Sequence, residues 1–135
     1  MGSGGYLGGG FGHFYAYAPV KIKYAIDRFT MEAKRQLHVL DVQLGKGRYL
    51  CGETYTIADM ACYPWYGKIA QGSLYGAKDF LDMDAYPNVR RWADDIAMRP
   101  AAIRGNKVNR TWGKKADQLP NRHSRADFDA LPKDE

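Results

Sequence analysis

Hydrophobic residues recur at steps of three and four along the stretch that follows Pro19, and this period is that of one face of an α-helix. The members of this apolar face are Ile22, Ala25, Ile26, Phe29, Ala33, Leu37, Leu40 and Leu44. Proline suits the start of a helix and glycine its left-handed end, so Pro19 and Gly45 predict a helix over about residues 20–44. At about 1.5 Å per residue this helix is roughly 37 Å long, enough to cross a small domain.

A second helix is predicted from a start signal. Thr56 can accept the amide proton of the third helical residue, and Asp59 at that position can reach back to the amide of Thr56, which together make a capping box. Tyr55 and Met60 occupy the positions of a hydrophobic staple across this start. Between residues 57 and 70 only two residues are charged, which predicts a helix that is buried on all sides.

A third apolar stripe, at helical spacing, predicts another helix near the C-terminal side. Its members are Val89, Trp92, Ala93 and Ile96. On its outer side we expect ion pairs four residues apart, Arg90 with Asp94 and Arg91 with Asp95. Pro100 then opens a short helix that ends at about residue 108.

The first segment of the chain is rich in glycine and aromatic residues. Glycines at positions 8, 9, 10 and 12 each cost roughly 1 kcal/mol inside a helix, so we expect a frayed or broken helix that a ligand or another domain can approach closely. Phe11, Phe14 or Tyr15, and Ala18 can still share one core face. Residues 71–86 mix glycine, aspartate and aromatics, and we expect a loop there.

Together these elements predict an all-α fold, a bundle of four to five helices. The 135 residues, 45% hydrophobic and 26% charged, suit a single core. No apolar run approaches the roughly 20 residues that a membrane span needs, and no charged stretch precedes a signal-like segment, so we expect a cytoplasmic protein.

Cysteine and histidine spacing gives no sign of redox or metal chemistry. Cys51 and Cys62 do not form a Cys-x-x-Cys motif and are interpreted as small buried residues, with a thiol role for Cys51 as the alternative. His13, His38 and His123 share no ligand spacing on a helix face, so we expect no metal.

Positive charge concentrates near the end of the chain. Residues 104–125 contain seven basic residues and one acid, a net charge of +6, whereas the whole chain carries +5. We therefore divide the chain into a helical domain, residues 1–108, and a tail, residues 109–135, which is first basic and then acidic. Because only Trp112 is interleaved as a stacking aromatic, the tail is interpreted as packing over the domain or attracting an anion, and nucleic-acid binding is the minor alternative.

These motifs, in this order and spacing, resemble the helical C-terminal domain of glutathione transferases. The matching stretches are residues 45–53 before the capping box, Thr56-Ile57-Ala58-Asp59 itself, and residues 86–92 and 98–101 after it. Residues 8–19 and Ala25-Ile26-Asp27-Arg28-Phe29 are similar to the bacterial Nu class, whose members are glutathione-dependent disulfide-bond reductases.

The resemblance implies a protein of two domains with different roles. In this family a thioredoxin-like N-terminal domain supplies most glutathione contacts and the group that activates sulfur, and nothing in this chain resembles that domain. We therefore expect this chain to be a fragment that begins inside the first helix of the C-terminal domain. We expect it to form a homodimer and to lack activity alone. In the complete protein we expect glutathione to be the cosubstrate of an electrophile or a disulfide. Neither a catalytic residue nor a metal is assigned to it.

The same resemblance suggests a set of binding residues. The arginine of Ala-Ile-Asp-Arg-Phe contacts a glutathione carboxylate in this class, which points to Arg28, and a guanidinium can donate two parallel hydrogen bonds to a carboxylate. The alternative is a solvated Arg28 paired with Glu32. With Arg28, Tyr15 and Tyr24 are expected to orient the peptide and to wall the electrophile pocket. Trp65, beside a kink at Pro64, is expected to wall the electrophile pocket or else to pack in the core.

Two other functions remain open at this point. Helical domains of this kind also serve in protein assembly without catalysis, and a basic module could bind nucleic acid. Binding that collapses with added salt would favour the nucleic-acid module.

Overall fold

The computed structural model describes residues 2–108 together with 114, 116 and 118. The chain divides into two compact units, Met1–Arg99 and Pro100–Glu135, and each is described by itself. The second unit contains one short helix, α6, at Pro100–Gly105. The predicted basic and acidic tail lies almost entirely outside the described residues, so the division of the chain at residue 108 stays a prediction.

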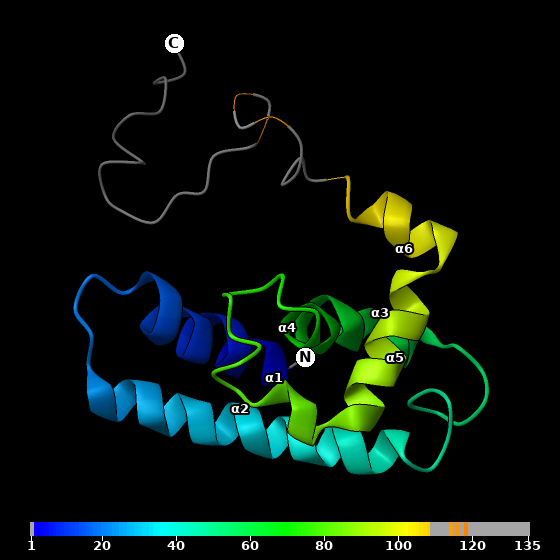
Figure 1. The fold of residues 1–135 in the computed structure, drawn as a ribbon, viewed down its shortest axis with the longest axis horizontal. Coiled ribbons are helices and arrows are strands. Elements are labelled where there is room, and N and C mark those ends of the chain that lie inside the picture. Colours follow the sequence, from blue (N-terminus) through cyan, green and yellow to red (C-terminus); the bar gives the residue numbers. More distant parts are fainter. Residues whose placement is uncertain (1, 109–113, 115, 117, 119–135) are drawn as a thin grey trace. The chain divides into compact units, whose positions relative to one another are not determined.

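All regular elements of the described residues are helical, and in the first unit α1 continues into η1 and α3 continues through η2 into α4 (Figure 1). The elements are α1 Gly2–Gly5, the π-helix η1 Tyr6–Tyr17, α2 Lys23–Leu44, α3 Ile57–Cys62, the π-helix η2 Tyr63–Gly67, α4 Lys68–Ala70, the short 3₁₀ turn η3 Met83–Ala85, and α5 Pro87–Ala97. The predicted all-α bundle of four to five helices is therefore confirmed, and residues 71–86 contain only turns and η3.

Helix α2 buries the C-terminal half of its predicted apolar face, which consists of Ala33, Leu37, Leu40 and Leu44. The N-terminal half is only partly buried, and Ile22 is 47% exposed. The helix begins three residues later than expected, at Lys23. The predicted left-handed end is wrong, because Gly45 has φ −71° and its amide donates to the carbonyl oxygen of Asp41 at 2.9 Å.

The glycine-rich first segment is not broken but continues as a helix from Gly2 to Tyr17. Two of its glycines lie directly against aromatic rings. A Cβ atom on Gly10 would lie 2.4 Å from the ring of Phe29, and one on Gly12 would lie 2.2 Å from the ring of Tyr75. The close approach that the glycines predicted is thus made by side chains of the same chain, which compensate for the low helix propensity of glycine.

The run from α3 through η2 to α4 changes hydrogen-bond register at Pro64, whose ring nitrogen cannot donate. It is not buried on all sides, as the sequence had suggested. Ile57 is 81% exposed and Met60 is 52% exposed, and Ala61 and Pro64 continue this exposed stripe at helical spacing.

Helices α2 and α5 cap each other where α5 crosses α2. The carboxylate of Asp41 on α2 accepts hydrogen bonds from the backbone amides of Asn88 and Val89 at 2.8 and 3.0 Å, at the start of α5. In return, Arg91 of α5 donates to the carbonyl oxygen of Leu44, the last residue of α2, at 2.8 Å, and to that of Gly47 beyond it at 3.2 Å. Each helix therefore satisfies end groups that its partner cannot satisfy internally.

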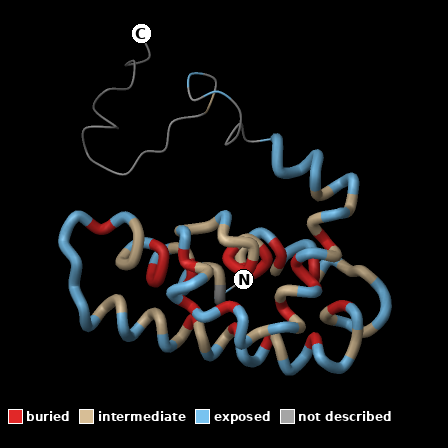
Figure 2. The backbone as a smooth tube through the Cα atoms, in the orientation of Figure 1, coloured by how far each residue is buried: buried red, intermediate tan, exposed pale blue. Residues whose placement is uncertain are grey.

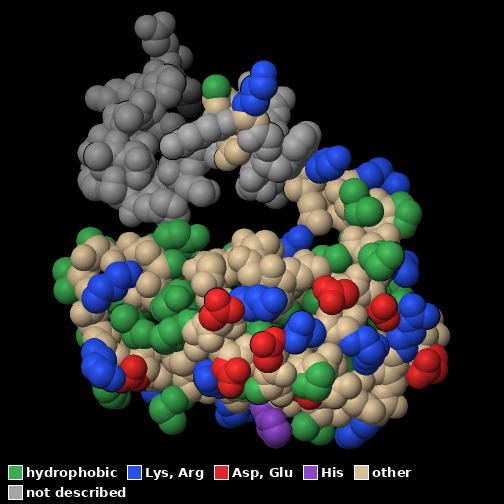
Figure 3. All heavy atoms as spheres, viewed as in Figure 1, with side chains coloured by type: hydrophobic (Ala, Val, Ile, Leu, Met, Phe, Trp, Pro, Cys, Tyr) green, Lys and Arg blue, Asp and Glu red, His purple; other side chains and the backbone are tan. Residues whose placement is uncertain are grey.

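The outer ion pairs of α5 are only partly as predicted. Arg91 lies 3.9 Å from Asp95, as expected. Arg90 instead pairs with Asp84 of η3 at 2.6 Å, so the predicted pair with Asp94 is wrong. Charged side chains of both signs intermingle over this part of the surface (Figure 3).

The core lies between η1, α2, the α3–η2–α4 run and α5, where the buried residues gather (Figure 2). Its largest fully buried side chains include Trp92, Phe11, Leu7, Leu37, Leu44 and Ile69. Each apolar side chain of this kind contributes about 1.5–3 kcal/mol by leaving water. In the described part of the chain, no helix is long and apolar enough to cross a membrane.

Candidate functional site

Arg28 lies on the exposed side of α2, and in the described part of the chain its guanidinium has no hydrogen-bond or ion-pair partner. The alternative pairing with Glu32 is wrong, because that carboxylate binds Arg35 at 2.6 Å and the amide of Gln36 at 2.9 Å. Hydrogen bonding from Arg35, then from Gln36, lowers the pKa of Glu32 to about 2. Arg28 adds only a weaker attraction through space and keeps its donors available.

Tyr24 precedes Arg28 by about one helical turn, so the two side chains share a face of α2. Its side chain is 79% exposed. Both members of the predicted glutathione-binding pair on α2 are thus open to solvent.

Tyr15, by contrast, belongs to an aromatic stack. Its ring contacts those of Phe11 and Phe80, with centroid distances of 5.1 and 4.5 Å and interplanar angles of 11° and 29°, and these two rings also lie 6.2 Å from each other. Its backbone carbonyl oxygen accepts a hydrogen bond from Lys21 Nζ at 2.8 Å. Offset stacking of this kind fixes the position of the ring beside the π-helix η1.

Trp65 of η2 packs its indole against the glycine-rich segment. Cβ atoms on Gly4 and Gly8 would lie 3.3 and 3.1 Å from its ring atoms, so the indole uses the space that the missing side chains leave. In the part of the chain that the structure describes, no hydrogen bond or ring contact joins Trp65 or Tyr15 to Tyr24 or Arg28. Of the four predicted residues, only Tyr24 and Arg28 are therefore brought onto one surface, the exposed face of α2.

The capping prediction at the start of α3 is confirmed. Thr56 Oγ1 accepts from the amide of Ala58 at 3.3 Å, and the carboxylate of Asp59 accepts from the amide of Thr56 at 2.9 Å. The predicted staple partners are arranged differently. Tyr55 lies under the guanidinium of Arg99, 3.8 Å from its ring centroid, whereas Met60 is half exposed.

Asp59 also accepts hydrogen bonds from outside the capping box. It is fully buried, and its Oδ1 accepts from the indole of Trp92 at 2.9 Å and from the amide of Leu50 at 3.0 Å. Burial by itself raises the pKa of a carboxyl group, but the hydrogen bonds from Leu50, Thr56 and Trp92 outweigh it and hold the pKa of Asp59 below its usual value. One carboxylate thereby ties α3 to α5 and to the preceding loop.

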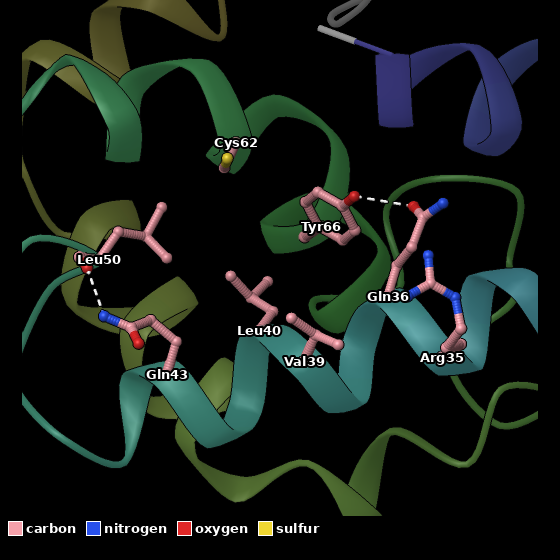
Figure 4. A pocket seen from close by; sticks show the side chains of 8 residues that line it. All are labelled: Arg35, Gln36, Val39, Leu40, Gln43, Leu50, Cys62 and Tyr66. Carbon is pink, nitrogen blue, oxygen red and sulfur yellow. Dashed lines mark hydrogen bonds between the residues drawn. The ribbon is translucent and has the colours of Figure 1, made fainter.

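A cavity of about 260 Å³ opens between α2 and the α3–η2 run, and we call it the Cys62 cavity (Figure 4). It is lined by Arg35, Gln36, Val39, Leu40, Gln43, Leu50, Cys62 and Tyr66. Sequence spacing does not predict this cavity, because its walls come from three separate stretches of the chain. The sequence shows only that Gln36, Val39 and Gln43 recur at helical spacing beside the predicted apolar face, which places them on one side of α2.

The polar groups around the Cys62 cavity bond to one another or to nearby protein groups. The hydroxyl of Tyr66 donates to Gln36 Oε1 at 2.8 Å, and Gln43 Nε2 donates to the carbonyl oxygen of Leu50 at 3.0 Å (Figure 4). Burial, and then the negative charge of Asp59, raises the pKa of the Cys62 thiol. This thiol is therefore less acidic than usual, which makes it a poor thiolate nucleophile.

Within the described residues, no group of three or more His, Cys, Asp or Glu side chains is arranged to hold a metal ion.

Comparison with known proteins assigns the chain to a family. The family described as "Glutathione S-transferase, C-terminal domain" matches residues 23–95, so the chain belongs to the glutathione S-transferase C-terminal domain family. This agrees with the resemblance that the sequence motifs indicated.

Particular relatives narrow the comparison. Disulfide-bond oxidoreductase YghU of Escherichia coli K12 is 54% identical over 134 residues, covering 99% of this chain and 46% of that protein. Disulfide-bond oxidoreductase YfcG of the same organism is 39% identical over 89 residues, covering 66% of this chain and 38% of that protein. The chain thus spans less than half the length of these relatives.

A solved structure shows the same fold. The crystal structure of glutathione transferase YghU from Streptococcus pneumoniae ATCC 700669, complexed with glutathione, matches with a TM-score of 0.77 and 54% identity. The match covers 79% of this chain and 41% of that chain.

Proposed function

We propose that this chain is the substrate-pocket half of a glutathione-dependent disulfide reductase or glutathione transferase, with glutathione as cosubstrate. Family membership supports the proposal, as do the E. coli relatives named disulfide-bond oxidoreductases and the S. pneumoniae relative crystallised with glutathione. In disulfide reduction, the thiolate of glutathione attacks one sulfur of the disulfide, a mixed disulfide forms, and the other sulfur leaves as a thiolate. A second glutathione releases the remaining thiol and forms glutathione disulfide.

The observation that carries the proposal is the uncommitted guanidinium of Arg28. A neighbouring arginine on the same helix, Arg35, is held by Glu32, whereas Arg28 has no partner in the described part of the chain. A free, planar guanidinium can bind a carboxylate with two parallel hydrogen bonds, and glutathione carries two carboxylates. The exposed hydroxyl of Tyr24, one turn away, can donate to the same peptide.

We propose that Tyr15 and Trp65 contribute aromatic walls to the same pocket. Both present aromatic surface that is fixed by packing, Tyr15 by its stack with Phe80 and Trp65 by its contact with Gly8. Rigid aromatic walls suit an apolar electrophile or disulfide because little side-chain freedom is lost on binding. We assign the group that activates the sulfur to the thioredoxin-like domain that the family resemblance implies. The half-buried thiol of Cys62 has a raised pKa, which makes it a poor nucleophile in place of glutathione.

The proposal is tested by titrating glutathione and by measuring steady-state disulfide reduction on two proteins. One is this chain alone, and the other is this chain joined to a thioredoxin-like domain of a relative. We expect turnover only in the two-domain protein, where Arg28→Ala should weaken glutathione binding by roughly 1.5 to 3 kcal/mol, the range for a hydrogen bond to a charged group.

Arg35→Ala is the matched control, since Arg35 lies on the same helix but is engaged by Glu32. Its glutathione affinity should stay close to that of the unmodified protein. Equal losses for Arg28→Ala and Arg35→Ala would show that net charge, and not a specific carboxylate contact, governs binding.

A non-catalytic assembly domain is the second candidate, and one observation favours it. The stripe formed by Ile57, Met60, Ala61 and Pro64 leaves apolar surface open along α3 and η2. Exposed apolar patches of this kind often mark interfaces. We propose a homodimer in either case, and light scattering at increasing protein concentration tests it. A constant monomer mass would contradict the dimer.

A further inference from the structure

The Cys62 cavity has no role in the function proposed above, and none of the four proposed glutathione-site residues lines it. We propose that it is a binding site for a small, neutral, aromatic molecule of one or two rings. Three features support this class of ligand. They are the size of the cavity, the hydrogen bonds that already engage its polar groups, and the thiol of Cys62 beside the ring of Tyr66.

The volume limits the ligand to a small molecule. The cavity holds about 260 Å³. An apolar cavity of about 150 Å³ is enough to bind benzene, whereas pockets for drug-sized ligands start at about 300 Å³. A ligand of one or two aromatic rings therefore fills the space between the walls formed by Val39, Leu40 and Leu50. Access is open, because Val39 is 56% exposed.

The polar groups of the cavity favour a neutral ligand. The positive charge of Arg35 is balanced by Glu32, which accepts hydrogen bonds from its Nε and Nη2 at 3.0 and 2.6 Å. Gln36 and Gln43 are engaged by Tyr66 and by the carbonyl oxygen of Leu50. A charged ligand would lose its hydration and would meet Glu32 as well as Arg35, so the net gain from charge is small.

The thiol of Cys62 and the ring of Tyr66 favour an aromatic ligand over an aliphatic one. Figure 4 shows the sulfur of Cys62 and the ring of Tyr66 on the α3–η2 side, facing the α2 residues across the cavity. A sulfur atom near a ring edge stabilises the contact by about 0.3–1.5 kcal/mol, and a second ring adds about 0.5–1.5 kcal/mol beyond its buried area. An aliphatic ligand of equal size gains neither contribution.

The alkylation rate of Cys62 can report ligand binding, with Cys51 as a control in the same chain. Cys62 lines the cavity, whereas Cys51 is exposed on the loop before α3. The full chain is treated with iodoacetamide, and the alkylation rate of each cysteine is followed by mass spectrometry with increasing toluene. We expect toluene to slow alkylation of Cys62 saturably, roughly tenfold at ten times the dissociation constant, and to leave Cys51 unchanged. An unchanged Cys62 rate at saturating toluene would overturn the proposal.

Benzoate, close to toluene in size but anionic, tests the charge of the ligand. At equal concentration we expect it to protect Cys62 far less than toluene does. Equal protection by benzoate would overturn the assignment to neutral ligands, and equal protection by cyclohexanol would overturn the assignment to aromatic ones.

A pair of variants on α2 tests the location. Val39→Phe places a ring in the cavity, while Val42→Phe adds the same ring at a position of similar exposure, 50%, that does not line the cavity. We expect toluene protection to be lost in Val39→Phe and retained in Val42→Phe. Because both positions are exposed, both variants should fold, which circular dichroism checks. Retained protection in Val39→Phe would show that toluene binds elsewhere.

Discussion

The start of α3 and the glycine-rich helix η1 are both helical, but for opposite reasons. At α3 the decisive groups lie within a few residues of each other, because Thr56 and Asp59 satisfy the first amides of the helix. In η1 the local propensity opposes a helix, and the helix exists because rings from Phe29, Tyr75 and Trp65 approach the glycine backbone closely. Local hydrogen-bond signals can therefore be read from sequence, whereas a helix stabilised by close packing cannot.

Asp59 has both local and distant hydrogen-bond partners. Its bonds to Thr56 follow from local spacing, but those to Trp92 and Leu50 join residues 33 and 9 positions away. The predictions below test how far each region depends on local or on distant partners.

The largest effect is expected for Asp59→Ala. The indole of Trp92 and the amide of Leu50 would lose their acceptor while buried, at a cost of about 1–3 kcal/mol each, in addition to the lost cap. Urea unfolding measures the loss. Asp94→Ala, at an exposed position, is the control and should change stability by less than about 0.5 kcal/mol. Similar losses for both would contradict the role of the buried network.

Gly12→Ala should be next in size. Its new methyl group would overlap the ring of Tyr75, and overpacking of this kind costs about 1–3 kcal/mol. Gly9→Ala is the matched control, because no atom lies within 4 Å of the added carbon, and it should stabilise the helix by about 0.5–1 kcal/mol. Opposite signs in thermal unfolding would establish that packing decides η1, and equal signs would contradict it.

Thr56→Ala tests the local side of the comparison. Without the hydroxyl the amide of Ala58 loses its acceptor, and we expect a loss of about 1 to 2 kcal/mol. Thr56→Ser keeps the hydroxyl and should lose much less. Equal denaturation midpoints for Thr56→Ala and the unmodified chain would remove the capping argument.

The smallest effect concerns the pH dependence of the surface pair of Glu32 with Arg35. Because the folded-state pKa of Glu32 is about 2 and the ordinary value is 4.5, its stabilising contribution is present above pH 4.5 and is lost as pH falls towards 2. Glu32→Gln should therefore show a lower melting temperature than the unmodified chain at pH 6, with the difference shrinking between pH 4.5 and 2. A difference independent of pH would contradict this pairing.

The predicted binding residues illustrate what local patterns leave open. The sequence suggested Arg28, Tyr24, Tyr15 and Trp65 through family resemblance, and their role in binding glutathione stays a prediction. Local spacing could place Tyr24 and Arg28 on one helix face, because both lie on α2. It could not say that Glu32 binds Arg35 in preference to Arg28, since both arginines lie within one turn of that carboxylate.

The sequence by itself determined the helical class, the buried C-terminal half of the α2 face and the capping box at Thr56. Each of these follows from groups within one or two helical turns, whose relative positions helix geometry dictates. The tertiary structure alone decided the continuity of η1, the exchange of caps between Asp41 and Arg91, and the Cys62 cavity. These depend on groups brought together from distant parts of the chain, and their distances follow from how the helices pack rather than from spacing along the sequence.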